Sequence, residues 1–181
     1  SSGNIKLEFM NLNLNELVQQ VNGEFTERFE SRNLDLICIL QPEPLLICAD
    51  SRRIWRVLEN LYVNVCKYAM PGTRVYVDAI KKDGKIQFSI KNISENPLNF
   101  QADELTERFI RGDVSRSTEG SGLGLSIAKN LTVLQHGSFN IYLDGDLFKV
   151  TITFDEAVKE KKPMPPMIVP EAVQEEAQQD A

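Results

Sequence analysis

Two short segments of the sequence combine residue types that bind phosphate and metal ions. The first runs from Glu119 to Lys129 and reads E-G-S-G-L-G-L-S-I-A-K. Its glycines lack a β-carbon, so the backbone can approach phosphate oxygens closely. The following residues, up to Leu134, have a helical pattern, and the amides at the start of a helix attract anions. A merely flexible loop before a helix does not account for the alternating glycines, so this segment predicts a phosphate-binding loop.

The second segment lies earlier in the chain and reads E-N-L-Y-V-N-V-C-K-Y-A from Glu59 to Ala69. Its Asn60, Asn64 and Lys67 fall on one stripe of a predicted helix. These side chains offer oxygen to a cation and positive charge to a phosphate. Taken alone, the segment is explained equally well by an amphipathic helix with a solvated polar face. Its place before the glycine-rich segment favours a joint site for phosphate and a cation.

The composition is that of one compact domain. The chain has 181 residues, 42% of them hydrophobic, and a net charge of −6. This length suffices for a single α/β core and is short for two. No apolar run is long enough to span a membrane, and no signal peptide is visible. The three cysteines form no C-x-x-C pair, which favours reduced thiols, and the acidic balance argues against a nucleic-acid interface.

Hydrophobic periodicity and turn residues divide the chain into alternating helices and strands. We expect a strand within residues 5–13, followed by a helix that is capped by Asn13 and ends near residue 32. Strands at 34–40 and 45–49 come next, and then a helix that is capped by Asp50 or Ser51 and ends near residue 69. The remaining elements are a hairpin at 74–91, a helix at 123–134 and a hairpin at 138–154. The charged stretch 93–119 has no sustained apolar period, which predicts a functional loop. Residues 1–3 resemble a cloning remnant, 4–154 form the predicted domain, and 155–181 are expected to be a disordered acidic tail rich in Pro, Glu and Gln.

Taken in order, these segments closely resemble the catalytic ATP-binding domain of sensor histidine kinases. N-L-Y-V-N-V-C-K-Y-A matches the N-box, E-L-T-E-R-F-I-R-G-D matches the F-box, and G-S-G-L-G-L-S-I-A-K matches the second glycine box. That family belongs to a wider ATPase group with gyrase, the ninety-kilodalton heat-shock chaperone and the MutL mismatch-repair proteins. The resemblance covers residues 5–154. It implies an α/β (α+β) two-layer sandwich of the Bergerat type, with a mixed β-sheet, three helices on one face and a mobile lid over the ATP.

The resemblance implies roles for the N-box residues. Asn64 stands at the magnesium-binding position, where a neutral amide suits an ion already bridged to phosphates. Asn60 stands where hydrolysing relatives carry a glutamate that activates water, and an amide cannot act as a general base. This difference favours a kinase over a hydrolase. Lys67, with Arg56 as a further candidate, would contact phosphate, and Tyr68 would line the nucleotide pocket.

The F-box and the second glycine box supply the remaining expected contacts. Phe109 is expected to anchor the hinge of the lid, and Arg108 to contact the nucleotide. Arg111 is expected to face the γ-phosphate, where charge developing on the transferring group requires a cation. Arg116 is a further candidate, and ordinary surface charge is the alternative for both arginines. The glycine box is expected to surround the nucleotide with Gly120, Ser121, Gly122, Leu123, Gly124 and Leu125, of which the two leucines would pack the lid hinge.

The chain departs from the family at the first glycine box. Members usually show D-x-G-x-G after the hairpin, where the aspartate accepts a hydrogen bond from the adenine amino group. The aligned residues here are N-I-S-E-N from Asn92 to Asn96, so the charge and both glycines are missing. The amide oxygen of Asn92 can still accept that bond. A nucleotide-binding regulatory or scaffold domain without phosphotransfer is therefore the alternative function.

The single histidine, His136, lies at the end of the last predicted helix, and we expect it to have a helix-end role. In the family the phosphoacceptor histidine lies on a separate upstream dimerisation domain. The resemblance therefore implies that the chain binds ATP and Mg²⁺ and donates the γ-phosphoryl group to a histidine on a dimerisation domain absent from this sequence. The intact two-component kinase would be a homodimer in the bacterial plasma membrane that signals to a response regulator. This domain would be cytoplasmic, without direct membrane contact. The identity of Asn60 disfavours a hydrolase, and the F-box disfavours a serine kinase of the same superfamily.

Overall fold

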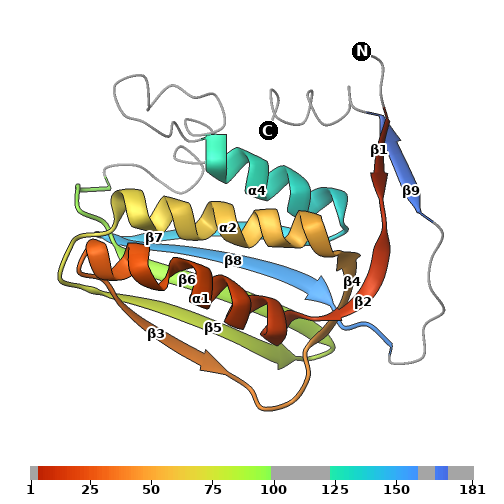
Figure 1. Ribbon diagram of the computed structural model, residues 1–181, viewed down its shortest axis with the longest axis horizontal. Coiled ribbons are helices and arrows are strands. Elements are labelled where there is room, and N and C mark those ends of the chain that lie inside the picture. Colours follow the sequence, from red (N-terminus) through yellow and green to blue (C-terminus); the bar gives the residue numbers. More distant parts are fainter. Residues whose placement is uncertain (1–3, 99–122, 159–165, 171–181) are drawn as a thin grey trace.

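The architecture is a five-stranded mixed sheet with helices packed on one face. The computed structural model describes residues 4–98, 123–158 and 166–170. The sheet strands are β3 (Asp35–Leu40), β5 (Arg74–Lys82), β6 (Lys85–Ile93), β7 (Ser138–Asp144) and β8 (Leu147–Asp155), and the helices of the described residues are α1 (Leu14–Ser31), α2 (Ser51–Tyr68) and α4 (Leu123–Leu134). The strand order is β3-β5-β6-β8-β7, with β3 parallel to β5 and the other pairs antiparallel. All three helices cover the same face of this sheet (Figure 1), which confirms the expected two-layer sandwich.

Alternation along the strands explains why the helices cover only one face. In β8 the inward side chains of Phe148, Val150, Ile152 and Phe154 are buried, and those between them are more exposed. Such alternation is typical of an antiparallel sheet with one wet face. The predicted hairpin of β5 and β6 is present and turns at Asp83 and Gly84, whose φ angles are 52° and 74°. Positive φ at both turn residues matches the twist of a tight hairpin.

Side-chain caps fix where the first two helices begin, as predicted. Asn13 Oδ1 accepts from the Asn15 backbone N–H at 3.1 Å, and Asp50 Oδ1 accepts from the Arg53 N–H at 3.1 Å. Each cap satisfies an N–H group that has no partner inside its helix. The other carboxylate oxygen of Asp50 accepts from the Glu8 N–H at 2.8 Å. Asp50 therefore holds the start of α2 against the N-terminal part of the chain.

Two expectations about the ends of the chain are wrong. Residues 5–13 do not form one strand, because β1 (Asn4–Leu7) pairs with β9 (Met167–Pro170), whereas β2 (Phe9–Asn13) pairs with β4 (Leu46–Asp50). The expected disordered tail therefore contains a strand. Its Val169 is 8% exposed and packs in a small apolar cluster with Leu7 and Phe9. Four residues in a Pro- and Glu-rich context are too few to give a periodic signal.

The residues directly after β8 are also held by the domain. Three hydrogen bonds join them to it: Glu156 N–H to Gly84 O at 2.9 Å, Ala157 N–H to Leu46 O at 2.8 Å, and Asn11 Nδ2 to Val158 O at 2.9 Å. Glu156 also forms an ion pair with Lys81 at 2.8 Å. The packed domain thus extends past the predicted boundary at residue 154.

Removing the C-terminal segment is expected to destabilise the domain. A chain ending at Asp155 loses the three hydrogen bonds and the burial of Val169 but no longer bears the entropy cost of ordering the segment, so the free energy of unfolding should fall by a net of about 2 kcal/mol. At this chain length the melting temperature should fall by roughly 4–8 °C. Within β9, Val169→Asp should lower the melting temperature, whereas Ile168→Asp should not, because Ile168 is 61% exposed. Identical melting curves for the shortened and full chains would contradict the docking of this segment.

Candidate functional site

Helix α2 carries the predicted polar stripe. The opposite stripe of the helix is almost fully buried and consists of Ile54, Val57, Leu58, Leu61 and Val65. This burial fixes the direction in which the polar stripe faces. Asn64 is 9% exposed, Asn60 is half-buried and Lys67 is exposed. The residues predicted from spacing therefore share one helix face, with the Asn64 amide set deeper than the Lys67 ammonium group.

Asn92, the predicted adenine acceptor, lies where β6 reaches the end of α2. It is 3% exposed. Two backbone hydrogen bonds join the two elements there, from Met70 N–H to Ile93 O and from Glu95 N–H to Tyr68 O, both at 2.8 Å, and together they form the antiparallel bridge between Ala69 and Ser94. The structure therefore brings Asn92 and Tyr68 to one junction, as a shared nucleotide pocket requires.

Two buried polar atoms in this region fit the groups of a nucleotide. Asn92 Oδ1 and Asn60 Nδ2 have no hydrogen-bond partner among the residues that the structure describes. An unpartnered buried polar group costs about 1–3 kcal/mol. The acceptor at Asn92 suits the amino group of adenine, and the donor at Asn60 suits a phosphate oxygen. Both costs would be relieved by one ligand that carries these two groups.

The start of α4 lies against α2 at Asn60, one of the residues of the polar stripe. A β-carbon at Gly124 would lie 3.9 Å from the backbone oxygen of Asn60, so the first turn of α4 packs against α2 at that residue. A helix N-terminus at this place would favour an anion beside Asn60. Leu125 is 3% exposed and belongs to the main hydrophobic core.

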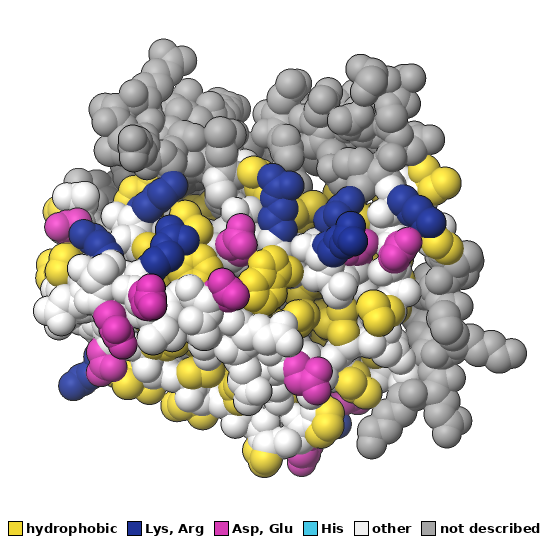
Figure 2. All heavy atoms as spheres, viewed as in Figure 1, with side chains coloured by type: hydrophobic (Ala, Val, Ile, Leu, Met, Phe, Trp, Pro, Cys, Tyr) yellow, Lys and Arg dark blue, Asp and Glu magenta, His cyan; other side chains and the backbone are white. Residues whose placement is uncertain are grey.

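From residue 99 onward, the predicted lid lies outside the described residues. This applies to Arg108, Phe109, Arg111, Arg116, Gly120, Ser121 and Gly122, and to the side chain of Leu123. Their roles stay predictions. The described surface nevertheless carries positive charge along α2, because Arg52, Arg56 and Lys67 are exposed. Figure 2 shows a row of Lys and Arg side chains across the helix-covered face, which would attract an anionic ligand.

The side chains available for a metal ion are limited. Within the described ranges, no group of three or more His, Cys, Asp or Glu side chains could hold an ion. The neutral amide of Asn64 could hold Mg²⁺ only together with oxygens from a ligand and water. These residues therefore fit an ion that arrives with phosphates.

The structure gives His136 a packing environment at the end of α4. Its φ is 67°, its N–H donates to Val133 O at 3.0 Å, and its ring stacks on Phe9 with centroids 5.7 Å apart. This position agrees with the predicted helix-end role.

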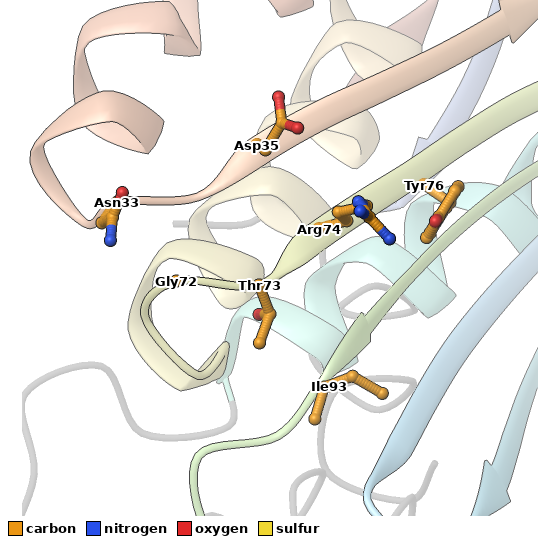
Figure 3. A pocket seen from close by; sticks show the side chains of 7 residues that line it. All are labelled: Asn33, Asp35, Gly72, Thr73, Arg74, Tyr76 and Ile93. Carbon is orange, nitrogen blue, oxygen red and sulfur yellow. The ribbon is translucent and has the colours of Figure 1, made fainter.

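A separate hollow of about 590 Å³ opens on the sheet face that carries no helices. Figure 3 shows its lining, which includes the outward side chains of Arg74 and Tyr76 on β5. The hollow shares no residue with the predicted nucleotide site. Sequence patterns also missed Arg32, which joins the elements of that site and lies directly before Asn33 in this lining.

Similarity to known proteins shows the family to which the chain belongs. The family of histidine kinase-, DNA gyrase B- and HSP90-like ATPases matches residues 49–158. The signal transduction histidine-protein kinase BaeS of Escherichia coli (strain K12) is 31% identical over 123 residues, which are 67% of this chain and 26% of BaeS. The chain thus spans about a quarter of that relative.

Solved structures extend the comparison to the fold. The catalytic domain of histidine kinase ThkA superposes with a TM-score of 0.71 at 26% identity, covering 82% of this chain and 96% of that one. Histidine kinase ThkA in complex with response regulator protein TrrA gives a TM-score of 0.68 at 25% identity, covering 86% of this chain and 44% of that one. The chain therefore belongs to the histidine kinase-, DNA gyrase B- and HSP90-like ATPases, and its fold and sequence are those of the ATP-binding catalytic domain of a sensor histidine kinase.

Proposed function

We propose that the chain binds Mg-ATP and donates the γ-phosphoryl group to a histidine on the dimerisation domain of the same kinase. The observation that carries this proposal is the pair of buried atoms Asn92 Oδ1 and Asn60 Nδ2, which have no hydrogen-bond partner in the described part of the chain. Adenine and phosphate would each satisfy one of them. The resemblance of the surrounding sequence to the N-box and the second glycine box of histidine kinases supports this proposal.

The residues of α2 would bind and orient the nucleotide. The amide oxygen of Asn64 would hold Mg²⁺, whose positive charge would offset that of the phosphates. Lys67 and Arg111 would contact phosphate oxygens as charge shifts toward the leaving ADP. A ring nitrogen of the acceptor histidine would then form a P–N bond while the bond from the γ-phosphorus to the ADP oxygen breaks. Because the Asn60 amide is not basic enough to activate water, hydrolysis of ATP would not compete efficiently with transfer to histidine.

The proposed partners are an upstream dimerisation domain and a response regulator. ThkA was solved with such a regulator, and the family resemblance extends the expectation to this chain. The intact kinase would be a homodimer, and we place it in the plasma membrane with this domain on the cytoplasmic side. In the described part of the chain, no helix is long and apolar enough to cross a membrane.

A scaffold domain without transfer activity is the second candidate. The observation in its favour is the altered adenine segment, residues 92–96, which lacks both glycines of D-x-G-x-G. The backbone there is engaged within the protein, because Ser94 N–H donates to Asp146 O at 2.7 Å and Asn96 N–H donates to Ser94 Oγ at 3.3 Å. A segment tied down in this way would adapt less to a nucleotide.

Phosphotransfer to a supplied domain separates the two candidates. The chain is incubated with γ-labelled ATP, Mg²⁺ and the dimerisation domain of its own kinase. Acid-labile, base-stable label is expected on the added domain only, and none when its acceptor histidine is replaced by alanine. Titration with ATP and ADP, with and without Mg²⁺, accompanies the assay. Nucleotide binding without transfer would favour the scaffold, and label on His136 would contradict the proposal.

A further inference from the structure

Arg32 joins three elements that surround the predicted nucleotide site. It is the residue after α1, and its guanidinium group forms two hydrogen bonds to the end of α2, from Nε to Cys66 O at 2.9 Å and from Nη2 to Ala69 O at 3.0 Å. The same Nη2 lies 3.6 Å from Glu95 Oε2, in the segment after β6. From the end of α1, this one side chain therefore contacts both the end of α2 and the adenine segment.

The carbonyl groups that Arg32 contacts are ones that need a partner. Carbonyls in the last turn of a helix have no N–H within the helix, and the negative end of the helix dipole lies there. A guanidinium group has several donors in a planar fork, so it can satisfy two carbonyls at once. The last turn of α2 also contains Lys67 and Tyr68, two of the predicted nucleotide contacts. Fixing the backbone of this turn positions the half-buried Tyr68 ring, whereas the long, exposed side chain of Lys67 can still adjust to a phosphate.

The contact with Glu95 connects α2 to the adenine side of the site. Glu95 donates its own N–H to Tyr68 O at 2.8 Å, so this residue is held to α2 by its backbone and to Arg32 by its carboxylate. The ion pair is half exposed, with side chains 35% and 49% accessible, so its own contribution is small. The two hydrogen bonds to carbonyls are the stronger part of the arrangement. Asn92 lies three residues before Glu95, at the end of β6.

The turn beside Arg32 supports the same junction. Asn33 O accepts from the Gly72 N–H at 2.7 Å, and Gly72 has a φ of 81°, which suits glycine at this turn. Figure 3 shows Asn33 beside this glycine turn. The end of α1 is thus held twice to the end of α2 and the turn after it, by the Arg32 side chain and by the Asn33 backbone.

We infer that Arg32 is a positioning residue for the base of the nucleotide. It sets the spacing between Tyr68 on α2 and Asn92 on β6, and so the width of the pocket in which adenine would lie. This inference rests on the proposed nucleotide site. It predicts that Arg32 affects the adenosine part of the ligand and not the phosphate part, which Asn64 and the glycine box would hold.

The test measures dissociation constants of ADP, Mg-ATP and magnesium tripolyphosphate for the intact chain and its variants. Arg32→Ala is expected to raise the constants of ADP and Mg-ATP by about the same factor, roughly fivefold or more, and to leave that of tripolyphosphate unchanged. Arg32→Lys keeps the charge and one donor and should recover part of the loss. In the transfer assay, KM for ATP should rise while kcat at saturating ATP stays the same.

The matched control is Arg28→Ala, one turn earlier on α1. Arg28 lies over the ring of Phe25, 4.7 Å from its centroid, so the substitution removes a similar side chain from the same helix. It should leave all three constants unchanged. Glu95→Gln, which keeps the backbone bond to Tyr68, should change them little. A lower melting temperature for Arg32→Ala with unchanged nucleotide binding would overturn the inference, as would an equal loss of tripolyphosphate binding. Failure of the unaltered chain to bind any of the three ligands would instead overturn the proposed function and this inference together.

Discussion

Replacing Asn64 by alanine is expected to weaken Mg-ATP binding by roughly 10–100-fold, the range found when even the outer partners of a metal site are lost. The structure supplies the reason. Asn64 is 9% exposed and lies on the stripe of α2 between Asn60 and Lys67. Its side chain is the most buried of the three, and water would have to replace its amide oxygen as a ligand of the ion. Binding of metal-free ADP should change far less.

The measurement is a calorimetric titration of each variant with Mg-ATP and with ADP in chelator. Asn64→Asp should retain more Mg-ATP binding than Asn64→Ala, because a carboxylate also binds Mg²⁺. Asn140→Ala on β7 is the control for removing an amide, since Asn140 is exposed on the sheet. If Asn64→Ala lowered the affinities for Mg-ATP and ADP equally, at unchanged melting temperature, Asn64 would contact the nucleotide and not the ion.

The local features of the fold could be predicted because each depends on neighbouring residues. Asn13 and Asp50 cap α1 and α2 as short polar side chains do at helix starts, and the turn at Asp83 and Gly84 follows from their tolerance of positive φ. The spacing of Asn60 and Asn64 likewise places both amides on one helical stripe. Predictions of this kind need no knowledge of distant contacts.

What could not be predicted depends on partners far apart in the sequence. Strand β9 gains its structure from pairing with β1 and from the burial of Val169 against Leu7, and neither contact is visible in the four residues of β9. Arg32 carried no signal either, because a basic residue at the end of a helix is ordinary. Its importance comes from the carbonyl groups of α2, which only the folded chain places beside it.

The adenine segment could be predicted only in part. The sequence predicted Asn92 as the acceptor that replaces the family's aspartate, and its burial at the end of β6 is compatible with that role. The missing glycines indicated a changed pocket without showing its form. In the structure, Ser94 and Glu95 bind to Asp146 and Tyr68 through their backbone, and so take up fixed positions where the family has flexible glycines.

Asn92→Ala is expected to weaken ATP binding by about 1–2 kcal/mol, or roughly 5–30-fold, without destabilising the free protein. Asn92 Oδ1 is buried without a partner among the described residues. Removing it leaves the adenine amino group unsatisfied in the complex but relieves an unsatisfied acceptor in the free domain. The melting temperature without nucleotide should therefore stay the same or rise. A purely structural asparagine would show the opposite, with lower stability and unchanged affinity.

Asn92→Asp separates the hydrogen bond from the shape of the side chain. A carboxylate is a stronger acceptor than an amide, so ATP binding should be kept or strengthened. The free protein should lose stability, because the substitution buries a charge with no partner, and ATP should restore part of that loss. GTP carries a carbonyl where adenine has its amino group. It should bind poorly to the original chain, and more poorly still to Asn92→Asp, because an amide can rotate to offer its NH₂ group and a carboxylate cannot. Comparable affinities of the original chain for ATP and GTP would mean that Asn92 is rotated or does not contact the base.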